Sequence, residues 1–170
     1  MKLGKLEIDL RELTRFIVSA KKKGYAGNGE KIREADDSKT FVFQDENFYY
    51  TDNYAGSSQA PGNEIVRWKK GDGQRIWQMS YSGGMLPEFW GDKELMKETF
   101  ECLKKSLLLI DFEHPFRGPE KYIWNNLKYV SSIKGDIKRF NGKERIIDKR
   151  LNEIIFSQEF IGCLVVPKIK

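Results

Sequence analysis

Apolar residues recur at helical spacing in two separate parts of the chain, and each part follows an aspartate that can cap a helix. We predict that the first helix begins at Asp9, with Glu12 completing a capping-box-like start, and ends at Gly24. We predict that the second helix begins near Asp92 and, like the first, packs on a sheet. The residues expected to face the core are Leu10, Leu13, Phe16, Ile17 and Ala20 in the first helix and Leu95, Thr99, Phe100, Leu103 and Leu107 in the second.

Elsewhere the pattern changes to the two-residue alternation that is typical of strands. Turn-forming residues indicate hairpin loops at residues 45–47 and 70–74. Residues 25–38 and 55–63 are polar and rich in residues that favour loops, so no strand is predicted there. The predicted strands are residues 41–44, 48–54, 64–69, 75–82, 127–133, 137–147 and 154–166.

Part of this pattern occurs twice along the chain. A separation of 79 or 80 positions relates Tyr50 to Tyr129, Gly56 to Gly135, Gly62 to Gly142, Glu64 to Glu144, Trp77 to Phe156, Tyr81 to Phe160, and Gly83 to Gly162. Each copy reads as a helix followed by an antiparallel meander, over residues 9–85 and 92–166. We therefore predict an α+β fold in which two tandem helix-plus-meander repeats share one core, in a single domain of residues 1–170.

Alternation along the strands places several aromatic and acidic side chains on one face of the predicted sheet. The candidate ligand-binding residues are Tyr50, Asp52, Tyr54, Glu64, Trp77 and Tyr81. Aromatic bodies with polar tips around a few carboxylates describe a ligand pocket, and aromatic faces attract cations. The expected ligand is therefore small and either polar or cationic. The same pattern is also typical of a sheet core in which hydroxyls and buried acids find partners, so both interpretations stay open at this point.

Charge and composition argue against a nucleic-acid partner and against a membrane protein. Lys and Arg outnumber Asp and Glu by 30 to 25, but the charges are dispersed, so a nucleic-acid partner is not expected. The dense basic run Lys21-Lys22-Lys23 is expected at the end of the first helix, where cations complement the helix dipole; a phosphate-binding patch is the alternative. The N-terminus lacks the apolar stretch of a signal peptide, and no apolar run approaches the ~20 residues of a membrane span. We therefore expect a cytoplasmic protein without a membrane partner.

Motifs for metals, cofactors and catalysis are missing. The chain has a single histidine, His114, and no cysteine cluster, so no metal site is expected. It has neither a Walker motif nor a G-x-S-x-G elbow, so no cofactor and no catalytic residue are predicted. Asp52 and Glu64 are the pair that a hydrolase would use as acid and base, although two carboxylates alone are a common pattern.

Four motifs stand out in the first half of the chain: Phe16-Ile17-Val18-x-Ala20-Lys21-x-x-x-Tyr25-Ala26, Tyr50-x-Asp52-x-Tyr54-x-Gly56, Gly62-x-Glu64-x-Val66 and Trp77-x-Met79-x-Tyr81-x-Gly83. Together they resemble a family of small uncharacterised bacterial and archaeal domains that occur alone or behind a helix-turn-helix region in regulators. The resemblance covers residues 10–85, and residues 115–119 and 135–144 are similar to the family's C-terminal portion. One departure is Ala60, which stands where an aromatic residue is expected.

These observations favour a non-enzymatic module that binds a small molecule or senses an effector. A regulatory role is implied by the resemblance alone, as an analogy. The first alternative is a hydrolase-type enzyme in which Asp52 and Glu64 face each other across an open cleft. The second is an interaction protein that forms a homodimer through an exposed sheet edge.

Overall fold

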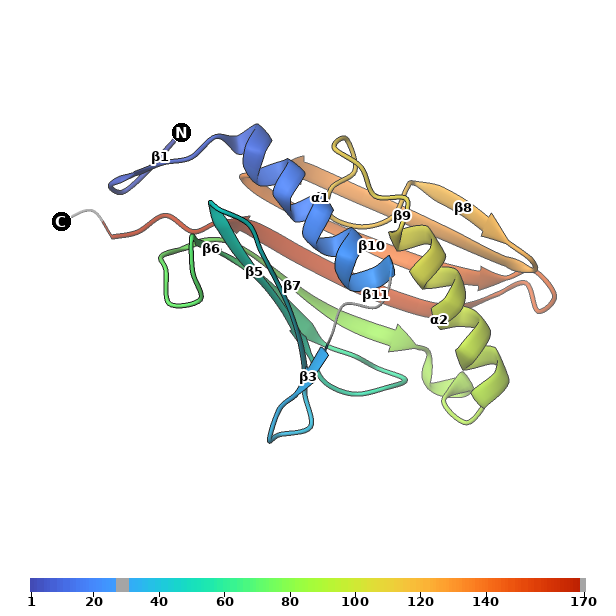
Figure 1. The fold of residues 1–170 in the computed structure, drawn as a ribbon. Helices are drawn as coiled ribbons and strands as arrows, with labels where there is room; N and C mark the ends of the chain where they lie inside the picture. The colour runs from blue at the N-terminus through green and yellow to red at the C-terminus, as the bar shows by residue number, and fades with distance from the viewer. Residues whose placement is uncertain (27–30, 169–170) are drawn as a thin grey trace.

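Residues 1–26 and 31–168 are described by a computed structural model, which contains a nine-stranded antiparallel sheet and two α-helices (Figure 1). Helices α1 (Leu10–Ala26) and α2 (Lys93–Leu107) cover the same face of the sheet. The predicted α+β class, with helices packed on an antiparallel sheet, is confirmed. Within the described ranges, neither helix is long and apolar enough to cross a membrane.

Both helices begin where the sequence predicts. The Asp9 carboxylate accepts hydrogen bonds from the backbone N–H groups of Arg11 at 2.7 Å and Glu12 at 3.3 Å. The Asp92 carboxylate accepts one from the backbone N–H of Leu95 at 2.9 Å. Each aspartate therefore satisfies donors that have no partner inside the helix.

The predicted end of α1 is wrong, because Gly24 lies inside the helix, which continues to Ala26. A Cβ atom at position 24 would lie 3.0 Å from the ring of Phe41 on β4 (Lys39–Gln44). Glycine therefore serves here to let the helix approach the sheet closely, and not to end the helix.

The strands of the large sheet agree with the prediction except at its two edges and at the start of β6 (Gly62–Trp68), which begins at Gly62 inside a segment that was predicted as a loop. Strands β1 (Lys2–Leu3) and β2 (Leu6–Glu7) were not predicted, and they form a separate two-stranded sheet. The edge strand β3 (Lys31–Arg33) lies in the segment that was predicted as a loop, of which residues 27–30 are outside the described residues. The other edge strand, β8 (Lys121–Trp124), has no counterpart in the prediction. The remaining elements are β5 (Phe48–Tyr54), β7 (Arg75–Met85), the 3₁₀ turn η1 (Pro87–Phe89), β9 (Leu127–Asp136), β10 (Arg139–Asp148) and β11 (Glu153–Leu164).

One pairing of distant strands joins the two halves of the chain. The strand order in the large sheet is β3-β4-β5-β6-β7-β11-β10-β9-β8, so β7 and β11 are neighbours in its middle. Their antiparallel ladder runs from Trp77 opposite Leu164 to Met85 opposite Phe156. The face beneath the helices is therefore continuous from the first half of the chain to the second.

The strands on either side of this junction pair in the same register. Glu64 lies opposite Met79 on β7, and Glu144 lies opposite Gln158 on β11. Both ladders also shift at an irregularity, which follows Val66 on β6 and Ile146 on β10. The pairing thus follows the spacing of the sequence repeat, whereas the superposition of the two helix-plus-meander units stays a prediction.

Two clusters of buried side chains lie beneath the helices, one under α1 and one under α2. Phe116, from the loop after α2, joins the α1 cluster, where its ring stacks on Phe140 with 3.6 Å between centroids. Trp77 stacks on both rings from β7. In the predicted helix faces, Leu10 and Phe100 are half-buried and the other residues are buried. The loop after α2 therefore connects the two halves through the core.

Candidate functional site

The six predicted site residues lie on one face of the sheet, the face that the helices cover. Three rows of paired residues contain them: Tyr50, Val66 and Trp77; Asp52, Glu64 and Met79; and Tyr54, Gly62 and Tyr81. The register on which the prediction depended is therefore present. The predicted residues differ in whether they reach open space, because the helices cover part of this face and leave another part open.

A cavity of about 270 Å³ lies between the two helices and this face. Of the six predicted residues, Asp52, Tyr54 and Tyr81 line it. Tyr50, Glu64 and Trp77 lie outside its lining, and each is at most 1% exposed. The remaining lining residues are Gly24, Lys31, Phe41, Ala60, Phe100, Leu103, Lys104, Leu107, Arg117 and Gln158.

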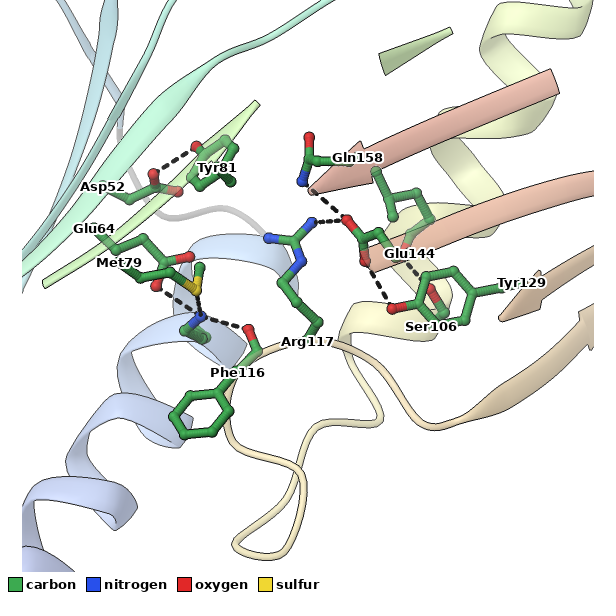
Figure 2. A network of polar contacts seen from close by, with 12 residues as sticks. Asp52, Glu64, Met79, Tyr81, Ser106, Phe116, Arg117, Tyr129, Glu144 and Gln158 are labelled. Atoms are coloured by element: carbon green, nitrogen blue, oxygen red, sulfur yellow. Dashed lines mark hydrogen bonds and ion pairs between the residues drawn. The ribbon is translucent and has the colours of Figure 1, made fainter. Parts of the chain in front are cut away.

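Asp52 is the acidic group of the cavity. It is 7% exposed, and its Oδ1 accepts a hydrogen bond of 2.7 Å from the hydroxyl of Tyr81 (Figure 2). Gly62 makes this geometry possible, because a Cβ atom there would come within 2.5 Å of the Tyr81 ring. Burial, and next the negative charge of Glu64, raise the pKa of Asp52 to about 7. Asp52 therefore exchanges a proton near neutral pH.

Glu64 forms a buried ion pair with Lys21 of α1. The Lys21 Nζ lies 2.7 Å from Oε2 of Glu64, and both side chains are 0% exposed. The same ammonium donates a hydrogen bond of 2.6 Å to the backbone carbonyl of Phe116. Burial lowers the pKa of Lys21, and the Glu64 carboxylate opposes this shift. The prediction that the run Lys21-Lys22-Lys23 lies at the end of the helix is confirmed for Lys23, which is in the last turn of α1, and wrong for Lys21, whose ammonium group is buried against the sheet before that turn.

A second buried ion pair lies on the other side of the cavity. Arg117 Nη2 lies 2.6 Å from Oε1 of Glu144. Glu144 also accepts hydrogen bonds from the hydroxyl of Tyr129 at 2.7 Å and the amide of Gln158 at 2.9 Å. The Arg117 guanidinium lies 5.6 Å from the ring centroid of Tyr81. Figure 2 shows Arg117 between the Asp52–Tyr81 pair and Glu144, so it connects the two groups of acids.

Five residues of this network were not among the predicted site residues: Lys21, Arg117, Tyr129, Glu144 and Gln158. The sequence repeat related Tyr129 and Glu144 to Tyr50 and Glu64 without giving them a role at the site. Lys21 could have been found, because it follows Ile17 by four positions and Leu13 by eight and so lies on the apolar face of α1. Gln158 carried a comparable signal, because it lies between Phe156 and Phe160 on one face of a predicted strand. Arg117 carried none, since it lies in an irregular loop. Among the described residues, no group of three His, Cys, Asp or Glu side chains is placed to hold a metal ion.

Removing either partner of the Lys21–Glu64 pair should destabilise the fold strongly. A buried charge that loses its partner typically costs about 3–5 kcal/mol. We therefore expect Lys21→Met and Glu64→Gln each to lower the free energy of unfolding, measured with urea, by an amount of this order. The double variant should recover part of the loss, whereas strictly additive losses would contradict a direct interaction. The exposed Lys70–Asp72 pair, with Lys70→Met, is the matched control.

The stability of the protein should depend on pH through Asp52. Since its pKa is raised from 3.8 to about 7, the folded state holds a proton that the unfolded chain has already released between these values. The free energy of unfolding of the natural protein, relative to Asp52→Asn, should fall by about 1.4 kcal/mol per pH unit from about pH 4 to 7 and stay level above pH 7. Urea unfolding of both proteins from pH 4 to 9 measures this, and a constant difference would contradict the shifted pKa.

Residues 52–165 match the family described as Domain of unknown function (DUF5680). The match covers more than half of the 170-residue chain and includes Asp52, Glu64, Tyr81, Arg117 and Glu144, whereas Lys21 lies before it. No curated protein and no solved structure matches the chain. The chain therefore belongs to this family of domains of unknown function.

Proposed function

We propose that this domain binds a small molecule in the cavity between α1, α2 and the sheet, and that it acts as a non-enzymatic effector-sensing module. The observation that carries the proposal is the placement of a buried carboxyl group, Asp52, at a cavity with apolar walls. Pockets for small molecules combine mostly apolar walls with a few polar groups that orient the ligand.

The lining of the cavity supports this interpretation. Apolar contact comes from four side chains on β4 and α2: Phe41, Phe100, Leu103 and Leu107. Polar groups come from Asp52 and Tyr81 on one side and from Arg117 and Gln158 on the other. The volume of about 270 Å³ lies just below the range of about 300–1,000 Å³ that is typical of ligand pockets. The cavity therefore suits a small ligand.

The position of the cavity suits sensing. Gly24 lines it from α1, and several residues of α2 line it from the other side. A ligand that touches both helices would favour one arrangement of the helices over others, by as much as its affinities for the arrangements differ. Ligand binding would then change the surface that the helices present to a partner.

The alternatives have less support from the geometry. A hydrolase would need Asp52 and Glu64 to face one substrate, but the Glu64 side chain is 0% exposed and held by Lys21. A homodimer through a sheet edge would use β3 or β8, which are three and four residues long. Very short edge strands are a common protection against edge-to-edge pairing.

We also propose that the two halves of the sheet are equivalent units, over residues 9–85 and 92–166, that have diverged at this site. The matching registers of Glu64 and Glu144 support this. Asp52 lies opposite Glu64 on the neighbouring strand, and Ser131 lies in the corresponding place opposite Glu144. The cavity acid therefore belongs to the first unit alone.

Asp52→Asn should abolish ligand binding and leave the fold intact. The variant removes the titratable carboxyl group that faces the cavity and keeps the size of the side chain. A screen of small amines, alcohols, carboxylates and amides by thermal shift, followed by calorimetry, identifies a ligand, since a compound at 100 times its dissociation constant adds about 2.7 kcal/mol of stability.

Asp72→Asn, in the exposed β6–β7 turn, is the control and should bind like the natural protein. If Asp52→Asn binds equally well, or if it unfolds under conditions where the control is folded, Asp52 has a structural role and the proposed site is wrong.

A further inference from the structure

We propose that the ligand of this cavity is an organic monocation with an apolar body, and that its charged group binds at Asp52 in exchange for a proton. The inference rests on the proposed function of the cavity and adds the chemical class of the ligand. The exchange is balanced, because one proton leaves the Asp52 carboxyl for solvent as one positive charge enters the cavity.

The charge balance beneath the helices supports a cation. Lys21 from α1 neutralises Glu64 from β6, at 2.7 Å. Arg117 from the loop after α2 neutralises Glu144 from β10, at 2.6 Å. Asp52 is a third carboxyl group in the same buried region, so its ionised form adds one negative charge beyond these two pairs. A buried charge of this kind is costly unless an opposite charge approaches it.

A proton and an organic cation can both supply that charge. In the empty cavity a proton does so, which agrees with the pKa of about 7 that burial and the neighbouring Glu64 give to Asp52. Three neighbours act in the opposite direction and favour the carboxylate: the Tyr81 hydroxyl, which donates a hydrogen bond to Oδ1, and the positive charges of Lys21 and Arg117. Since the two forms of Asp52 are both populated near neutral pH, a cation competes with a proton there.

The walls of the cavity suit a cation with an apolar body. Four of its lining residues are aromatic: Phe41, Tyr54, Tyr81 and Phe100. Aromatic faces attract cations, most strongly when water is excluded. Two of these rings already have basic groups of the protein near their centroids, Lys31 and Lys39 at Tyr54 and Arg117 at Tyr81. The rings that remain for a ligand are those of Phe41 and Phe100, and together with the Asp52 carboxyl group they favour a positive ligand with an apolar body over a neutral one.

The basic residues of the lining do not turn it into an anion site. Lys31 and Lys104 are exposed, so water and salt screen their charges. The charge of Arg117 is balanced by Glu144 on β10. Gln158 on β11, which also lines the cavity, is neutral. An anion would also have to approach Asp52. Binding of an anion in preference to a cation is the outcome that the experiment must exclude.

Three compounds of one shape test the charge directly: phenethylammonium, phenethyl alcohol and phenylacetate, with n-butylammonium as a smaller cation. Calorimetry at pH 6 in two buffers of different ionisation enthalpy measures the protons released on binding. We expect the ammonium ions to bind at least tenfold more tightly than the alcohol and to release close to one proton each. At pH 8.5 the release should approach zero, and the affinity should rise about tenfold from pH 5 to pH 6.

Asp52→Asn should remove the preference for the ammonium ions and the proton release, whereas Asp72→Asn should keep both. Equal or tighter binding of the alcohol or of phenylacetate would overturn the cation inference and leave the binding function standing. Ammonium binding without proton release would overturn the exchange. If none of the four compounds binds or raises the melting temperature, the cation inference fails, and the broader compound screen decides separately whether the cavity binds any ligand.

Discussion

The arrangement of this molecule depends on the ion pair that Lys21 and Glu64 form beneath α1. A carboxylate on the covered face of a sheet is unfavourable unless a cation reaches it. Lys21 provides that cation from the helix, and its hydrogen bond to the carbonyl of Phe116 ties the loop after α2 to the same point. One ammonium group therefore fixes the helix, the sheet and the loop that joins the two halves of the chain relative to one another.

The need to pair buried charges also determines which charged group faces the cavity. The loop that Lys21 holds continues directly into Arg117, which neutralises Glu144 and passes over the ring of Tyr81. Once these two pairs are formed, Asp52 is the carboxyl group that faces the open space, with Tyr81 as its hydrogen-bond donor. The charge that would orient a ligand thus follows from how the fold balances its own buried charges.

The sequence alone predicts the starts of the helices and the inner strands of the large sheet, because their signals are local, but it misses the short strands β1, β2, β3 and β8. Asp9 and Asp92 mark the starts of the helices, and alternation places Asp52, Tyr54 and Tyr81 on one face. The roles of Glu64 and Trp77 cannot be predicted from the residues next to them in the sequence. Whether an acid on that face meets a ligand or a lysine depends on which helix residue covers it, and that is decided by packing between distant segments. Within the basic run, Lys22 and Lys23 are exposed, whereas Lys21 is buried because it lies on the side of α1 that packs on the sheet.

The most direct test of this account is the protonation of Asp52 in the intact protein. With carbon-13 labelled aspartate, the side-chain carboxyl resonance of Asp52, assigned by comparison with Asp52→Asn, can be followed by NMR as the pH is raised. A titration midpoint near 7 is expected, because burial and Glu64 both disfavour the carboxylate. A midpoint close to the ordinary value of 3.8 would mean that Asp52 is an ordinary solvated acid, and it would contradict the charge balance on which the proposed site rests.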